Sequence, residues 1–160
     1  MASKVLEKED FKEDPEENGQ EEYELDEEPL FLVDEVGLEN NIGRILIGFG
    51  IPPHLKGYKY LKSGIMMILM NEHMTIAITK NLYPQLALKY NTTITSVERD
   101  MRHAIETAWR NTRSRYKEFY FGKGSVQVSE GRKPNNGLFI NTVAEKIRQN
   151  LKGQISLMSL

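Results

Sequence analysis

Cysteine is absent from this sequence of 160 residues. Its absence excludes disulfides, zinc fingers, iron–sulfur clusters and thiol nucleophiles, and it is typical of proteins from the reducing cytoplasm. Histidine is scarce as well, because the sequence contains only His54, His73 and His103, scattered without the ligand spacing of a metal site. We therefore expect neither a metal site nor a cofactor.

Long apolar runs are also missing. The longest extends over residues 65–70, far short of the roughly 20 residues that span a bilayer. Residues 1–10 lack the apolar region of a secretory signal. No Ser/His/Asp set and no pair of carboxylates is arranged for catalysis. We expect a cytoplasmic protein that is not an enzyme, contacts no membrane and takes no small-molecule substrate.

The charges are divided unevenly along the chain. Residues 1–39 contain 16 acidic side chains and three lysines, a net charge of −13. Residues 40–160 contain 18 lysines and arginines and seven acidic side chains, a net charge of +11. A basic body is suited to a polyanion such as nucleic acid. Many soluble domains are modestly basic, however, so charge alone leaves this function open.

The acidic N-terminal segment, residues 1–36, is predicted to be disordered. It has few apolar side chains to bury, and Pro15, Gly19 and Pro29 interrupt any regular structure. Two interpretations of its charge stay open. The acidic side chains could compete with DNA phosphates for the basic body and so inhibit binding, or they could only confer solubility.

The remaining sequence predicts an all-α body. Apolar side chains recur at helical spacing and no alternating strand pattern competes with them. A capping box of Thr95 and Glu98 predicts where the longest polar-faced helix begins. We expect a domain over residues 37–153, a loop over 122–134, a C-terminal tail over 154–160, and about six helices: 38–49, 58–71, 74–81, 82–90, 95–111 and 137–152.

Residues 82–111 have the layout of a helix-turn-helix unit. A short helix meets a polar turn, Asn91-Thr92-Thr93, and a longer helix follows. Leu86 and Ala87 are expected to pack on the second helix. That helix has a buried stripe and a polar face, with these residues on the stripe: Val97, Met101, Ala104, Ile105 and Ala108. The polar face consists of Glu98, Arg99, Arg102, His103 and Glu106.

The polar face has the chemistry for reading DNA. An arginine can bond to guanine O6 and N7 with both arms of its guanidinium, and a carboxylate can accept from cytosine N4. Near the helix start, Thr93, Thr95 and Ser96 can hold phosphate oxygens together with backbone N–H groups. The alternative is an ordinary solvated face on which Glu98 and Arg102 form an ion pair.

The body resembles the C-terminal DNA-binding effector domain of the response regulator of sporulation initiation, stage zero sporulation protein A. The resemblance covers about 38–151 and rests on four runs of sequence: GIPPHLKGYKYL at 50–61, ITKNLYP at 78–84, KYNTTITSVERDMRHAIETAW at 89–109 and KPNNGLFI at 133–140. It implies six helices with the helix-turn-helix at the centre. It also implies a sequence-specific bacterial transcription factor that binds tandem DNA sites head to tail.

The resemblance assigns roles to individual residues. Glu98, Arg99 and Arg102 match the base-reading positions of the family, and His103 lies beside them. Lys133 matches a lysine in the C-terminal loop that reaches DNA.

Two positions depart from the family pattern. Ser96 replaces the usual arginine, and Asp100 replaces the usual alanine and adds negative charge near the groove face. Family members also have a phosphorylatable receiver domain. The 39 residues before the body are too few for one, so we expect no aspartyl-phosphate switch within this chain.

Double-stranded DNA is therefore the expected partner, and helix 95–111 is the element expected to read the major groove. Head-to-tail self-association on tandem sites is expected as well. The alternative is a protein-interaction antagonist that pairs with full-length family members and binds DNA weakly.

Overall fold

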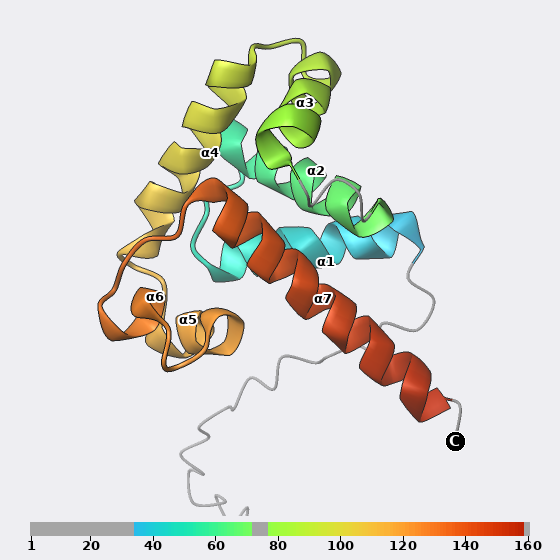
Figure 1. The fold of residues 1–160 in the computed structure, drawn as a ribbon, viewed down its shortest axis with the longest axis vertical. Helices are drawn as coiled ribbons and strands as arrows, with labels where there is room; N and C mark the ends of the chain where they lie inside the picture. The colour runs from blue at the N-terminus through green and yellow to red at the C-terminus, as the bar shows by residue number, and fades with distance from the viewer. Residues whose placement is uncertain (1–33, 72–76, 159–160) are drawn as a thin grey trace, which may run out of the picture.

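The computed structural model describes residues 34–71 and 77–158, and this part of the chain is helical with no strand. The all-α prediction is confirmed. Figure 1 shows the arrangement of the helices, whose bounds are as follows. They are α1 (Glu35–Gly48), α2 (Lys56–Met70), the π-helix η2 (Ile78–Leu82), α3 (Tyr83–Lys89), α4 (Ile94–Trp109), α5 (Ser114–Phe121), α6 (Val126–Ser129) and α7 (Asn136–Met158).

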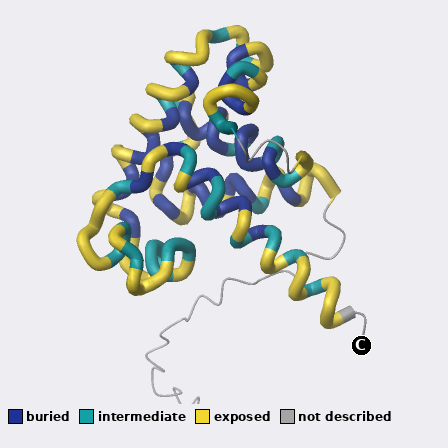
Figure 2. The backbone as a smooth tube through the Cα atoms, in the orientation of Figure 1, coloured by how far each residue is buried: buried dark blue, intermediate teal, exposed yellow. Residues whose placement is uncertain are grey.

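The central helix of the bundle is α2, which packs against α1, α4 and α7. Buried positions gather where these helices meet, while the far end of α7 is exposed (Figure 2). Gly57 permits a close crossing of α2 and α4, because a Cβ atom there would lie 2.1 Å from the backbone oxygen of Asp100 and 2.7 Å from the Cβ of Ala104. A larger residue would push α4 away from α2, so this glycine helps to set the position of α4.

The predicted capping box at Thr95 is wrong. The N-cap of α4 is Thr93, whose backbone is extended and whose Oγ1 accepts a hydrogen bond of 3.1 Å from the N–H of Ser96. Thr95 lies inside the first turn. Both threonines have a chemically suitable hydroxyl, and the tight turn before the helix decides which one caps it.

The predicted loop over 122–134 is wrong in part, and one helix was not predicted. The loop contains the single turn α6, although Gly122 to Ser125 do form a surface turn. The unpredicted helix is α5, whose rings cover Phe49: the ring centroid of Tyr116 lies at 4.8 Å and that of Tyr120 at 4.9 Å. None of its residues is buried and Phe119 is exposed, which is why no clear stripe marks this helix in the sequence.

Three further predictions concern residues at the ends of the described ranges. Residues 74–76 of the predicted helix 74–81 lie outside the described residues, and its end coincides with η2. The last helix extends to Met158, past the predicted end at 152. Residues 1–33 of the predicted tail also lie outside the described residues, and α1 begins at Glu35 with the side chain of Asp34 as its N-cap.

Candidate nucleic-acid interface

The turn between α3 and α4 is a tight C-terminal cap. The N–H of Thr92 donates to the carbonyl oxygen of Ala87 at 2.9 Å, and that of Asn91 donates to Leu88 at 3.3 Å. This is the Schellman pattern, in which one residue after the helix adopts a left-handed backbone. Asn91 does so with φ +49°, and asparagine tolerates this region better than most residues. The turn is therefore built into the local sequence.

The inner faces of α3 and α4 hold the unit on the core, as predicted. Leu86 and Ala87 are buried on α3. On α4, the whole predicted stripe is buried. The stripe consists of Val97, Met101, Ala104, Ile105 and Ala108. Because this face is fixed against α2 and α3, the opposite face of α4 is held toward solvent.

The exposed face of α4 collects most of the predicted site residues. Glu98, Arg99, Arg102 and His103 are exposed along it. At the start of the helix, Thr93 and Thr95 are exposed and Ser96 is half-buried. The structure thus places seven of the eight predicted residues on one helix and its cap.

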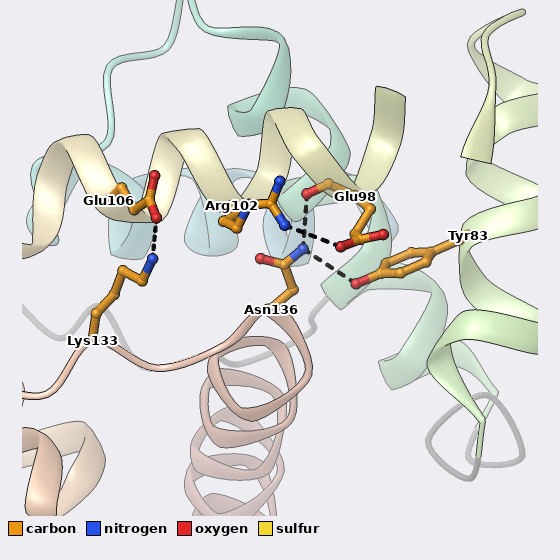
Figure 3. Close-up of polar contacts among 6 residues, drawn as sticks. All are labelled: Tyr83, Glu98, Arg102, Glu106, Lys133 and Asn136. Carbon is orange, nitrogen blue, oxygen red and sulfur yellow. Dashed lines mark hydrogen bonds and ion pairs between the residues drawn. The ribbon is translucent and has the colours of Figure 1, made fainter. Parts of the chain in front are cut away.

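Lys133 is the eighth predicted residue, and it reaches this face from the loop before α7. Its ammonium group donates to the carboxylate of Glu106 on α4 (Figure 3). This hydrogen bond holds the pKa of Glu106 below its ordinary value. The loop is thereby tied to the middle of the exposed face, across a sequence separation of 27 residues.

Carboxylates pair with both arginines of the face. Arg102 lies 3.3 Å from Glu98, one helical turn earlier, and Arg99 lies 3.5 Å from Asp100. The ion pair between Glu98 and Arg102, which was the alternative interpretation of this face as an ordinary solvated one, is therefore present. Both arginine side chains are more than half exposed. Exposed pairs are worth about 0–1 kcal/mol, so they can exchange for contacts with a ligand.

Asn136 is a buried polar residue that the sequence analysis missed. From the first turn of α7, its Nδ2 donates to the backbone oxygen of Glu98 at 3.0 Å and to the hydroxyl of Tyr83 at 3.2 Å (Figure 3). Burial raises the pKa of Tyr83 above its ordinary value of 10.0. One side chain thus joins α3, α4 and α7. The only signal in the sequence is an asparagine pair before the last helix.

A groove of about 680 Å³ lies beside the C-terminal half of α4. The loop before α7 forms its other side, since the indole Nε1 of Trp109 donates to the carbonyl oxygen of Gly131 at 3.2 Å. Arg110 also lines this groove, and the sequence analysis missed it. The groove is lined by His103, Glu106, Thr107, Trp109, Arg110, Gly131 and Lys133.

Two further features are absent from the part of the chain that the structure describes. Across 34–71 and 77–158, no three acidic or histidine side chains come together in a way that could hold a metal ion. Nor does any helix in that part combine the length and apolar character of a membrane span.

An all-helical body that presents a helix-turn-helix unit on its surface is the architecture of a DNA-binding effector domain. The comparison with protein families agrees. The family model described as "Sporulation initiation factor Spo0A C terminal" matches residues 42–147. The chain therefore belongs to this family, as the resemblance in the sequence indicated.

Proposed function

We propose that this chain is a sequence-specific regulator of transcription that inserts the N-terminal half of α4 into the major groove of DNA. The observation that carries the proposal is the placement of Arg99 and Arg102. Both are exposed on the face of α4 opposite its buried stripe, one helical turn apart. A forked guanidinium at such a place can read guanine, and an α-helix fits the major groove.

The neighbouring residues suit supporting roles. The carboxylate of Glu98 is chemically suited to accept from cytosine, while Thr93, Thr95 and Ser96 lie at the N-terminus of α4, where backbone N–H groups attract phosphate. His103 and Lys133 lie further along the same side and suit contacts with the DNA backbone. On binding, the exposed ion pairs of the arginines would exchange for contacts with bases. Head-to-tail association of two copies on tandem sites is part of this proposal.

A protein-interaction antagonist is the second candidate. The observation in its favour is that both reading arginines are already paired with carboxylates, one of them the family-atypical Asp100. An antagonist would pair with full-length family members and bind DNA weakly. It would therefore need the body but not Arg99 or Arg102.

Selection of duplexes from a random library with the full chain tests the first candidate. We expect an enriched sequence motif, and each of Arg99→Ala and Arg102→Ala should cost about 1–3 kcal/mol of binding to it and relax the choice of one base. Arg44→Ala, at an exposed position of α1, is the matched control. Enrichment of no motif, or wild-type binding by both arginine variants, would reject α4 as the reading helix.

A further inference from the structure

Three positive charges lie where α4 meets α5, outside the proposed base-reading face. The link between the two helices is four residues long and includes Arg110 and Arg113, both exposed. Lys117 follows one turn into α5. Within the described ranges, none of these three cations forms an ion pair with a carboxylate, whereas both arginines of the reading face do. Their charge is thus available to an external anion.

The link between α4 and α5 is anchored to the C-terminal end of α1, so its backbone is already in place before an anion binds. The buried hydroxyl of Thr112 lies 2.7 Å from the carbonyl oxygen of Phe49. Tyr116, two residues after Ser114 at the start of α5, donates to the carbonyl oxygen of Ile45 at 3.3 Å. With the link held at Thr112 and again just after it at Tyr116, the arginines lose less conformational freedom when they bind.

The buried Trp109 lies beneath this basic surface. The Nζ of Lys117 lies 4.7 Å from the centre of its indole ring, and Arg110 is the next residue along the chain. Lys133 joins them from the loop that accepts the indole hydrogen bond. Burial lowers the pKa of Lys117, and a bound anion would stabilise its charged form.

The position of Arg110 relative to Arg102 favours a contact at the edge of the major groove. Arg110 is the exposed C-cap of α4, eight residues beyond Arg102, and is rotated about 80° from it around the helix axis. Arg102 and Arg110 are separated by about 12 Å along the helix axis. The major groove is also about 12 Å wide. With Arg102 at the bases, an offset of about 12 Å and 80° directs Arg110 out of the groove, toward the phosphate backbone at its edge.

We propose that Arg110, Arg113 and Lys117 form a second phosphate-binding surface, which contacts the DNA backbone beside the base pairs that α4 reads. The inference rests on the proposed function and adds to it a source of affinity. These contacts strengthen binding to every sequence, because phosphates carry no base identity. The exposed reading arginines then supply selectivity while the α4–α5 link supplies much of the charge attraction.

The test compares two double variants of the full chain. Arg110→Gln/Arg113→Gln removes two charges from the link, and Arg44→Gln/Lys152→Gln removes two from exposed positions on α1 and the far part of α7. Binding of a library-selected duplex and of a scrambled duplex is measured against salt concentration. For the link variant we expect the log–log salt slope to fall by about two units for both duplexes. Between 50 and 200 mM salt, this makes the loss of affinity about tenfold smaller than for wild type.

The control variant should keep the wild-type slope, and both variants should keep the wild-type circular dichroism. A wild-type slope in the link variant overturns the inference while leaving the proposed function intact. Loss of discrimination between the two duplexes in the link variant also overturns it, since the arginines would then read bases. If wild type binds neither duplex, the proposed function fails as well, so the two failures are distinguishable.

A free phosphate could occupy the same surface, and Trp109 can decide between the two sources because it is the single tryptophan of the chain. We expect its fluorescence to change on addition of duplex and to stay constant with inorganic phosphate at the same phosphate concentration. A saturable change with inorganic phosphate alone, lost in the link variant, would overturn the assignment to the DNA backbone.

Discussion

Replacing Asn136 with alanine should destabilise the whole helix-turn-helix unit. The side chain is 7% exposed and donates to both Tyr83 and the backbone of Glu98. Each hydrogen bond contributes about 0.5–1.5 kcal/mol, so their joint loss should cost about 2 kcal/mol. In the variant, the carbonyl oxygen of Glu98 still lies within α4. The buried hydroxyl of Tyr83, in contrast, loses the hydrogen bond from Asn136, and this loss adds to the cost.

Urea unfolding followed by circular dichroism measures the effect. We expect the midpoint to fall without a change in slope, because the surface exposed on unfolding stays the same. Asn150→Ala, at an exposed position of the same helix, is the control and should stay within about 0.5 kcal/mol of wild type. In a double-mutant cycle, Tyr83→Phe should cost less in the Asn136→Ala background than in wild type. An unfolding free energy equal to that of the Asn150→Ala control would refute the role of Asn136.

The remaining predictions concern the charges around α4. Lys133→Ala should weaken binding to cognate and random duplexes alike and reduce the log–log salt slope by about one unit; a loss confined to the cognate duplex would instead make Lys133 a base reader. The carboxyl pKa of Glu106 lies below its ordinary value of 4.5 because Lys133 donates to it, so the contact should stabilise the fold above pH 4.5 and lose that contribution as the pH falls through the lowered pKa. An NMR titration should show this low pKa returning toward 4.5 in Lys133→Ala, and an unchanged value would contradict the contact. Deleting residues 1–33 leaves the Asp34 cap of α1 in place and should tighten binding to random DNA at low salt, with the gain fading as salt is added; equal affinities at low salt would leave solubility as the role of the acidic segment.

The helix-turn-helix unit could be predicted from the sequence because its signals are local. Val97, Met101 and Ile105 recur at helical spacing, and their burial follows from that periodicity alone. Asn91 lies where a left-handed residue must end the first helix. The outward face of α4 needed no further information, since burying one side of a helix exposes the other. The base-reading assignments of that face rest on residue chemistry, which the binding experiments test.

Only the tertiary structure could reveal the contacts that join distant segments. Lys133 and Glu106 are 27 residues apart, and Asn136 and Glu98 are 38 apart. No local period relates such pairs, because their distance depends on how α7 and its preceding loop cross α4. The same holds for Lys117 over Trp109, which exists because α5 folds back beneath the end of α4. Even the choice of Thr93 over Thr95 as the cap depended on backbone geometry in the turn, since both hydroxyls have the same chemistry.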